Sequence, residues 1–161
     1  MTVSADEFKA TLQYWASGVT VVTTASPVHG LLGMTATSFA SVSADPAQIL
    51  VCVNDASITA SGINEAQHFA VNLLAADQQA VSNLFAGSTN EVDRFSSVSW
   101  SEGAAGVPLL DESVAVLECK VVQQLRAGTH WVIIGEVNAV HCKGGDPLLY
   151  FRAGYRELQL S

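Results

Sequence analysis

The chain has few basic side chains. Its 161 residues include only seven Lys and Arg against fifteen Asp and Glu, which gives a formal net charge of −8 and a pI near 4.7. Nucleic acids and anionic membranes are bound through clustered Lys and Arg that replace counterions, and here the basic residues are scattered. We therefore expect neither a nucleic acid nor a membrane as a partner.

Cysteine and long apolar runs are also scarce. Cys52, Cys119 and Cys142 are widely spaced, with no CxxC pair and no neighbouring histidine cluster of the kind that binds zinc, so they fit small buried hydrophobic residues best. No stretch approaches the roughly 20 apolar residues of a membrane-spanning helix, and no basic region followed by an apolar run opens the chain. We expect no metal and a reducing, cytoplasmic location.

Familiar catalytic patterns are missing as well. The chain has no Ser-His-Asp order, no paired carboxylates in an apolar setting and no phosphate loop of the Walker or Rossmann type. What it has is 49% apolar residues and a mean hydropathy of +0.31, enough for the core of one domain over residues 1–161.

Most of the periodic segments predict strands. Ser4 and Glu7 have capping-box spacing and open a helix over residues 4–16 that Gly18 ends, and two further helices are expected, from Ser57 through Ile63 and over 77–85. Runs rich in β-branched residues predict strands over 19–24, 31–37, 39–42, 49–53, 69–74, 114–125, 130–142 and 148–151.

The clearest pairing is an antiparallel hairpin. Strands 114–125 and 130–140 are joined by a turn over residues 126–129, and the strands do not alternate with helices in the βαβ manner. The sequence therefore predicts a mainly β fold, an antiparallel barrel with a few accessory α-helices, because closing the sheet removes its exposed edges.

A run of small hydroxylated residues marks a candidate site. Residues 33–43 contain five hydroxyls, one glycine and no charge, a surface that suits a flat heterocycle or a phosphate. Taken alone, an ordinary Ser/Thr-rich strand and turn explains this run better.

Ordered sequence blocks along nearly the whole chain favour the ligand-binding interpretation of this run. Through these blocks the chain resembles the short-chain flavin reductase family, the reductase halves of two-component flavin-dependent monooxygenases. The blocks are Trp15–Thr24, Gly33–Ser43, Phe69–Leu74, Gly106–Leu109, Cys119, Gly128–His130, and Pro147–Phe151 with Tyr155 and Arg156. Two positions depart from the family pattern. Its Gly-Asp-His stands here as Gly128-Thr129-His130, and its Pro-Pro stands as Pro46-Ala47.

The resemblance implies a split β-barrel of the Greek-key, FMN-binding type and a homodimer with the flavin near the subunit interface. It implies hydride transfer from NADH, with NADPH as the alternative, to FMN or FAD, and release of the reduced flavin to a separate monooxygenase by diffusion. Its catalytic residue here is His130, placed to reach the nicotinamide amide or a phosphate. Its cofactor-binding residues here are Thr35, Ala36, Thr37, Ser38, Ser41, Cys52, Val53, Asn54, Ser57, Thr59, Phe85, Thr129, Arg152, Tyr155 and Arg156.

Several of these residues have ordinary alternatives. Ser57 and Thr59 open a predicted helix, where unpaired N–H groups suit a phosphate, but a serine there is as readily a plain N-cap. Arg152, Tyr155 and Arg156 could hold nucleotide phosphates or adenine, or be surface charges and a core tyrosine. Thr129 supplies a neutral hydroxyl where the family has a carboxylate.

Three functions fit the sequence. The first is an NAD(P)H:flavin oxidoreductase that uses flavin as a substrate. The second is a flavin carrier of the same barrel without catalysis, and the third is a barrel for another planar ligand such as haem or a pyridoxal phosphate. The third ranks last because no axial ligand or lysine stands near the expected site.

Overall fold

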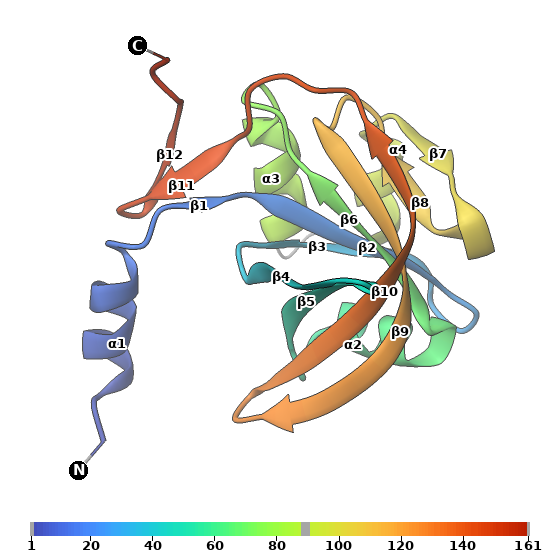
Figure 1. Ribbon diagram of the computed structural model, residues 1–161, viewed down its shortest axis with the longest axis horizontal. Helices are drawn as coiled ribbons and strands as arrows, with labels where there is room; N and C mark the ends of the chain where they lie inside the picture. Colours follow the sequence, from blue (N-terminus) through green and yellow to red (C-terminus); the bar gives the residue numbers. More distant parts are fainter. Residues whose placement is uncertain (1, 88–90, 161) are drawn as a thin grey trace.

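The computed structural model describes residues 2–87 and 91–160, with the side chains of 91–93 excepted, and its centre is a seven-stranded antiparallel sheet. In spatial order the strands are β3 (Gly30–Ala36), β2 (Thr20–Ser26), β6 (His68–Leu73), β9 (Ala115–Ala127), β10 (His130–Cys142), β5 (Ala47–Asn54) and β4 (Phe39–Ala44). The mainly β, antiparallel prediction is confirmed. The sheet curls strongly (Figure 1), but among the described residues β3 and β4 remain its unpaired end strands and no sheet closes.

The predicted hairpin is present and is the longest pairing in the molecule. β9 and β10 each run for thirteen residues, and Ala127 pairs with His130, so the connecting turn consists of Gly128 and Thr129. Gly128 has a φ of 59°, a left-handed conformation that glycine adopts without strain. The turn is therefore shorter than the expected 126–129, and it holds His130 at the very start of its strand.

The main core lies between the curled sheet and α2 (Ile58–Ala66). Val22, Val51, Phe69 and Ile133 are at most 1% exposed and form one apolar cluster with the buried face of this helix. Gly135 on β10 is required here, because a Cβ atom would come within 2.6 Å of the Phe69 ring.

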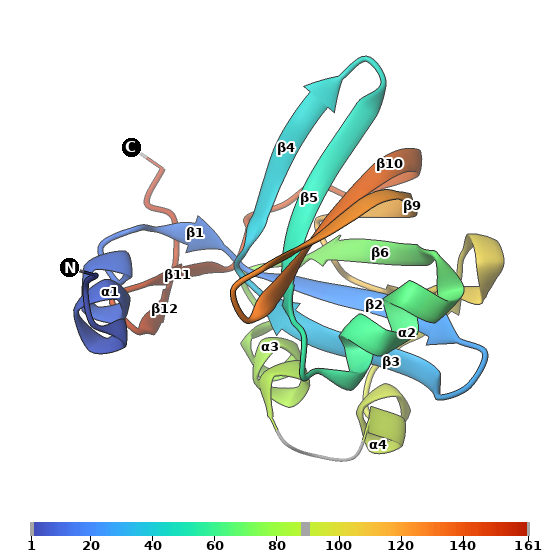
Figure 2. The same ribbon diagram turned by 90° about the horizontal axis from the view of Figure 1, so that it is seen from below.

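A second apolar cluster joins α3 (Gln79–Ala86) and α4 (Glu91–Ser96) to one side of the sheet. Phe85 packs edge-on against Phe95, and Arg94 is buried between α3 and β3, where its Nη1 donates to the Gly33 carbonyl at 2.9 Å. After α4 the chain forms β7 (Trp100–Glu102), the 3₁₀ turn η1 (Ala104–Gly106) and β8 (Pro108–Leu110), and β7 pairs with β8. Figure 2 shows α2 and α3 lying along β2 and β3.

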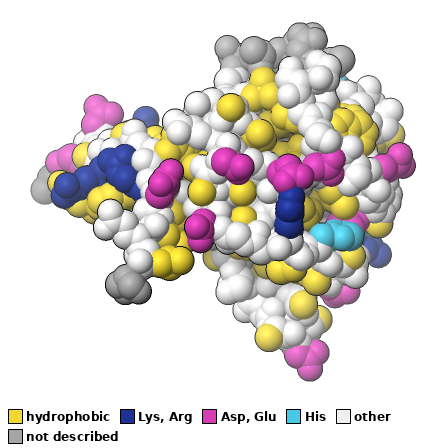
Figure 3. Space-filling model, turned by 90° about the horizontal axis from the view of Figure 1, so that it is seen from above, with side chains coloured by type: hydrophobic (Ala, Val, Ile, Leu, Met, Phe, Trp, Pro, Cys, Tyr) yellow, Lys and Arg dark blue, Asp and Glu magenta, His cyan; other side chains and the backbone are white. Residues whose placement is uncertain are grey.

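An arm extends from this body (Figures 1 and 2). It consists of α1 (Ala5–Leu12) and a small sheet of β1 (Ser17–Gly18), β11 (Leu149–Phe151) and β12 (Gly154–Arg156). The capping box of Ser4 and Glu7 is present, yet α1 buries none of its residues, and Trp15 just after it is 77% exposed. Lys and Arg side chains gather over the arm, while acidic side chains are scattered over the body (Figure 3).

Some sequence-based boundaries were wrong. The first helix ends at Leu12 rather than at residue 16, because Tyr14 and Trp15 donate to carbonyls three residues back and the Gln13 carbonyl accepts from the Arg152 N–H of the arm. The strands β7, β8 and β12 and the helix α4 were not predicted, since runs of three to six residues carry too little periodicity. No helix in the described ranges is both long and apolar enough to cross a membrane.

Candidate active site

The end of β5 and the start of β10 lie side by side at one rim of the sheet. Asn54 pairs with His130 and Cys52 with Val132, so the last residues of one strand face the first residues of the other. This pairing brings the family-derived segment 52–54 next to the Gly128–His130 turn. Residues more than seventy positions apart in sequence thus share one small region.

The α2 helix begins at this same rim. Ser57 is its N-cap and accepts from the Thr59 backbone N–H at 3.1 Å, so the plain capping role is present. The Thr59 hydroxyl is buried and has no hydrogen-bond partner among the described residues. An unpartnered hydroxyl in the first turn of a helix, at the positive end of the helix dipole, is an arrangement that an anionic group can satisfy. The residues present therefore fit a phosphate ester here.

The connection from β3 to β4 lies against the same two elements. The Ser38 hydroxyl donates to the Cys52 carbonyl at 2.8 Å, and the Cys52 N–H donates back to the Ser38 carbonyl at 3.1 Å. The Ser57 hydroxyl lies 3.7 Å from the Met34 sulfur. The hydroxyl-rich run is thereby fixed beside the helix start, with Thr37 and Ser38 exposed.

The end of β3, just before this connection, meets α3 and the arm. Thr35 Oγ1 donates to the Ser82 carbonyl at 2.6 Å, and the Ser82 hydroxyl lies 2.8 Å from the Tyr155 hydroxyl, which also donates to Asn83 at 2.7 Å. A cavity of about 400 Å³ opens here, within the size range of small-molecule sites, with Thr35, Thr37 and Tyr155 in its wall. These contacts join β3, α3 and β12 around one hollow.

The turn before β10 orients the only histidine at this rim. Thr129 Oγ1 lies 3.0 Å from His130 Nδ1, so this contact involves Nδ1 and not the other ring nitrogen, Nε2. The Thr129 carbonyl accepts from the Asp55 N–H at 3.0 Å, and Arg126 Nη2 lies 2.5 Å from Asp55 Oδ2. The turn is thus attached to the residues that precede α2.

The comparison with known families agrees with this geometry. Residues 12–159 match the family model described as a flavin reductase like domain. The chain belongs to this family.

Flavin reductases are also its relatives in sequence and structure. The chain is 36% identical, over 97% of its own length and 88% of the relative's, to the FMN reductase (NADH) RutF of Pseudomonas syringae pv. syringae. It is 41% identical, over 86% of its length, to the reductase component of the flavin-dependent trigonelline monooxygenase of Acinetobacter baylyi. The NADH:FAD oxidoreductase SgcE6 of Streptomyces globisporus, solved with NAD and FAD fragments, superposes with a TM-score of 0.90 at 30% identity, over 99% of this chain and 97% of that one. The chain spans less than half the length of some curated relatives, 44% and 45% in two cases.

Most of the residues expected from the flavin reductase family meet at the rim. Those that the structure brings together there are Thr35, Ala36, Thr37, Ser38, Cys52, Val53, Asn54, Ser57, Thr59, Thr129 and His130. Tyr155 reaches this group through Ser82 and the cavity.

Other expected residues lie elsewhere or face inward. Ser41 pairs with Ile49 and is three residues, about 10 Å, farther along the chain from Ser38. Phe85, like Val53 and Ala36, points its side chain into the core, so it can offer only backbone atoms to a ligand. Arg152 lies over the Tyr14 ring at 4.9 Å in the arm, and Arg156 Nη1 donates to the Tyr155 carbonyl at 2.8 Å. Their binding roles stay predictions.

Sequence reasoning missed Ser82, Asn83 and Asp55, and it offered Arg126 only as one of four arginines, with Arg94, Arg152 and Arg156, that could help to hold a cofactor phosphate. Ser82 and Asn83 contact the site only because α3 packs against β3, and no local sequence pattern predicts that packing. Asp55 carried a weak signal, since it directly follows Asn54, a residue expected from the family.

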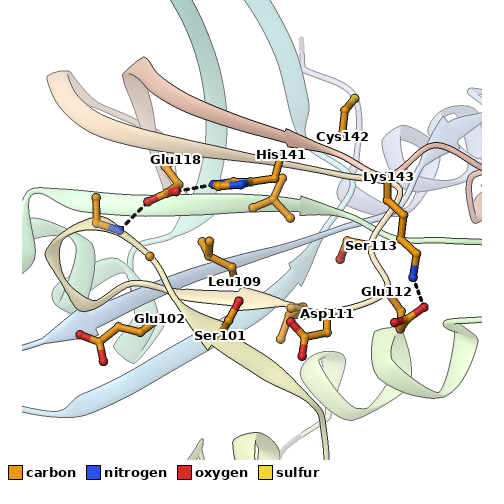
Figure 4. Close-up of a pocket in the computed structure, with 14 residues that line it drawn as sticks. Ser101, Glu102, Leu109, Asp111, Glu112, Ser113, Glu118, His141, Cys142 and Lys143 are labelled. Carbon is orange, nitrogen blue, oxygen red and sulfur yellow. Dashed lines mark hydrogen bonds and ion pairs between the residues drawn. The ribbon is translucent and has the colours of Figure 1, made fainter.

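A cavity of about 720 Å³ lies away from this rim, between the β7–β8 pair and the ends of β9 and β10 that are remote from their hairpin turn (Figure 4). Its central polar contact is the His141 Nε2 to Glu118 Oε1 pair at 2.6 Å, and Glu118 also accepts from the Ala104 N–H. Burial and the adjacent Glu118 carboxylate raise the pKa of the neighbouring Cys119 thiol to about 12. None of the expected cofactor-binding residues lines it.

Proposed function

We propose that this chain is an NAD(P)H-dependent flavin reductase that takes up FMN or FAD, reduces it with NADH and releases it. The observation that carries the proposal is the meeting of residues 34–38, at the end of β3 and in the connection after it, with the end of β5, the start of α2 and the His130 turn at one rim. The relatives named as NADH-dependent FMN reductases, one of them matched over 88% of its length, support it.

In this proposal the residues of the chain bind the flavin and the pyridine nucleotide and orient their rings. The first turn of α2, with Ser57 and the Thr59 hydroxyl, holds the flavin phosphate, and the groups of 35–38 meet the polar edge of the ring. The flavin supplies the electron-accepting ring, and the nicotinamide supplies the hydride. Catalysis is then largely a matter of placing the two rings face to face and excluding water between them.

His130 orients the nicotinamide in this scheme. With the Thr129 hydroxyl at Nδ1, the imidazole presents Nε2 to the carboxamide of the nicotinamide. Because a hydroxyl can donate as well as accept, Thr129 fits either tautomer, whereas the carboxylate typical of the family only accepts. We therefore assign Thr129 and His130 to nucleotide binding rather than to flavin binding.

We further propose a split-barrel homodimer in the cytoplasm. Among the exposed apolar side chains of the arm, Leu12, Trp15 and Tyr150 line a cavity together with Thr37, and a second copy of the chain is the occupant that buries them. All three cysteines are free, as a reducing compartment keeps them.

The partner of the reaction is a separate flavin-dependent monooxygenase that receives reduced flavin by diffusion. Relatives named as reductase components of monooxygenases support this role. The rim is open enough for a flavin to leave, since Thr37, Ser38 and Asn54 are exposed.

Turnover with added flavin tests the proposal. The purified protein should oxidise NADH rapidly only when catalytic free FMN or FAD is supplied and oxygen recycles it. Stoichiometric flavin binding without NADH consumption would favour the carrier function instead.

A further inference from the structure

An arginine near the end of β9 lies beside the start of α2. Arg126 Nη2 is 2.5 Å from Asp55 Oδ2, and Asp55 stands two residues before the N-cap Ser57. The Arg126 side chain is 64% exposed and that of Asp55 is 22% exposed, so the guanidinium faces solvent at the rim.

The backbone keeps these two segments together independently of the ion pair. The Asp55 N–H donates to the Thr129 carbonyl at 3.0 Å, and Asn54 pairs with His130 in the β5–β10 ladder. Arg126 therefore stays close to the helix start when its contact with Asp55 opens. An exposed ion pair contributes at most about 1 kcal/mol, so the guanidinium can exchange this partner for another anion at little cost.

The other arginines have different surroundings. Arg94 is buried and donates to backbone carbonyls, among them that of Gly33. Arg152 and Arg156 belong to the arm. Among the arginines, Arg126 is thus the one whose contacts place it at the start of α2.

We propose that Arg126 is the cation that binds the phosphate of the flavin. Asp55 positions the Arg126 guanidinium and, in the flavin-free protein, partly neutralises its charge. The proposal rests on the proposed function, since it assigns a residue to the phosphate of that substrate. A guanidinium offers a planar pair of N–H donors that matches a phosphate, and the N–H groups of the helix start face the same anion.

The two side chains then act with opposite sign. Removing the Arg126 charge leaves the Asp55 carboxylate to repel the phosphate, and removing the Asp55 charge frees the guanidinium. For charges about 6 Å apart in water, each unit charge changes the affinity for a dianion by about tenfold. Riboflavin has the same ring and ribityl chain but no phosphate, so its affinity should not respond.

Dissociation constants of FMN and riboflavin, measured by fluorescence quenching at low ionic strength, test this. We expect Arg126→Gln to weaken FMN about tenfold, Asp55→Asn to strengthen it, and the double variant to lie between the two, with riboflavin unchanged throughout. Lys120→Gln is the matched control, because it removes a positive charge from an exposed position of the same strand. It should change neither constant.

Three results would overturn the assignment. Equal weakening of FMN and riboflavin by Arg126→Gln would mean that the side chain shapes the turn and does not bind phosphate. A raised KM for NADH with an unchanged FMN-to-riboflavin ratio would assign Arg126 to the pyridine nucleotide. Wild-type protein that binds neither flavin would contradict the proposed function itself, and the Arg126 assignment with it.

Discussion

Replacing Thr59 by valine should move stability and flavin affinity in opposite directions. The Thr59 side chain is fully buried at the first turn of α2, and its hydroxyl has no partner among the described residues. An unsatisfied buried hydroxyl costs about 1–3 kcal/mol, and valine has the same shape with a similar helix propensity. The flavin-free Thr59→Val protein should therefore gain about 1 kcal/mol in its free energy of unfolding.

Binding should show the reverse. If the hydroxyl donates to the flavin phosphate, the variant loses a hydrogen bond to a charged group worth about 1.5–3 kcal/mol, and FMN binds about tenfold or more weakly. Riboflavin should bind as before. Urea unfolding without flavin and fluorescence titration with both flavins measure the two effects.

Thr24→Val is the control for the stability half. Thr24 is equally buried, but its hydroxyl donates to the His68 carbonyl at 2.7 Å, so its loss should destabilise the protein. The reasoning is refuted if Thr59→Val destabilises the flavin-free protein as Thr24→Val does, or if FMN affinity stays at the wild-type value.

Other variants test the nucleotide turn, the core and the buried thiol. Thr129→Asp should change the KM for NADH and leave flavin affinity alone, and unchanged steady-state kinetics would remove Thr129 from nucleotide binding. Gly135→Ala should lower the free energy of unfolding by about 3 kcal/mol, because its Cβ would lie 2.6 Å from the Phe69 ring, whereas Gly18→Ala, with no atom within 4 Å, should be nearly neutral in the same urea titration. Because the pKa of the Cys119 thiol is raised in the folded protein, the thiol loses its proton at a lower pH in the unfolded chain than in the native state. The contribution of the buried thiol to stability is therefore complete below pH 9.0 and is lost as the pH rises toward about 12. Between these values Cys119 should resist thiol reagents in the native protein and react once the chain is unfolded in urea, and rapid native labelling would contradict its burial.

Long periodic segments were predictable from the sequence. The thirteen-residue strand over 130–142 was placed at both ends correctly, because β-branched residues fill it and the Gly128 turn starts it. The capping box of Ser4 and Glu7 was predictable from spacing alone, and the structure contains both of its hydrogen bonds.

Long-range contacts were beyond local reasoning. The Ser82 carbonyl accepts from Thr35 across 47 positions, and Arg126 meets Asp55 across 71, and neither distance leaves a trace in residue spacing. The inward direction of Phe85 follows from the close approach of Gly33, where any Cβ would come within 2.8 Å of the ring. Such packing depends on how two elements meet, and not on either element alone.

The most direct test is an anaerobic single turnover. The protein, mixed with one equivalent of FMN and excess NADH, should bleach the flavin's visible absorbance in one step whose rate saturates with NADH, and NADH deuterated at the transferred position should slow that step. Flavin that stays oxidised while bound to the protein, at any NADH concentration, would contradict the account.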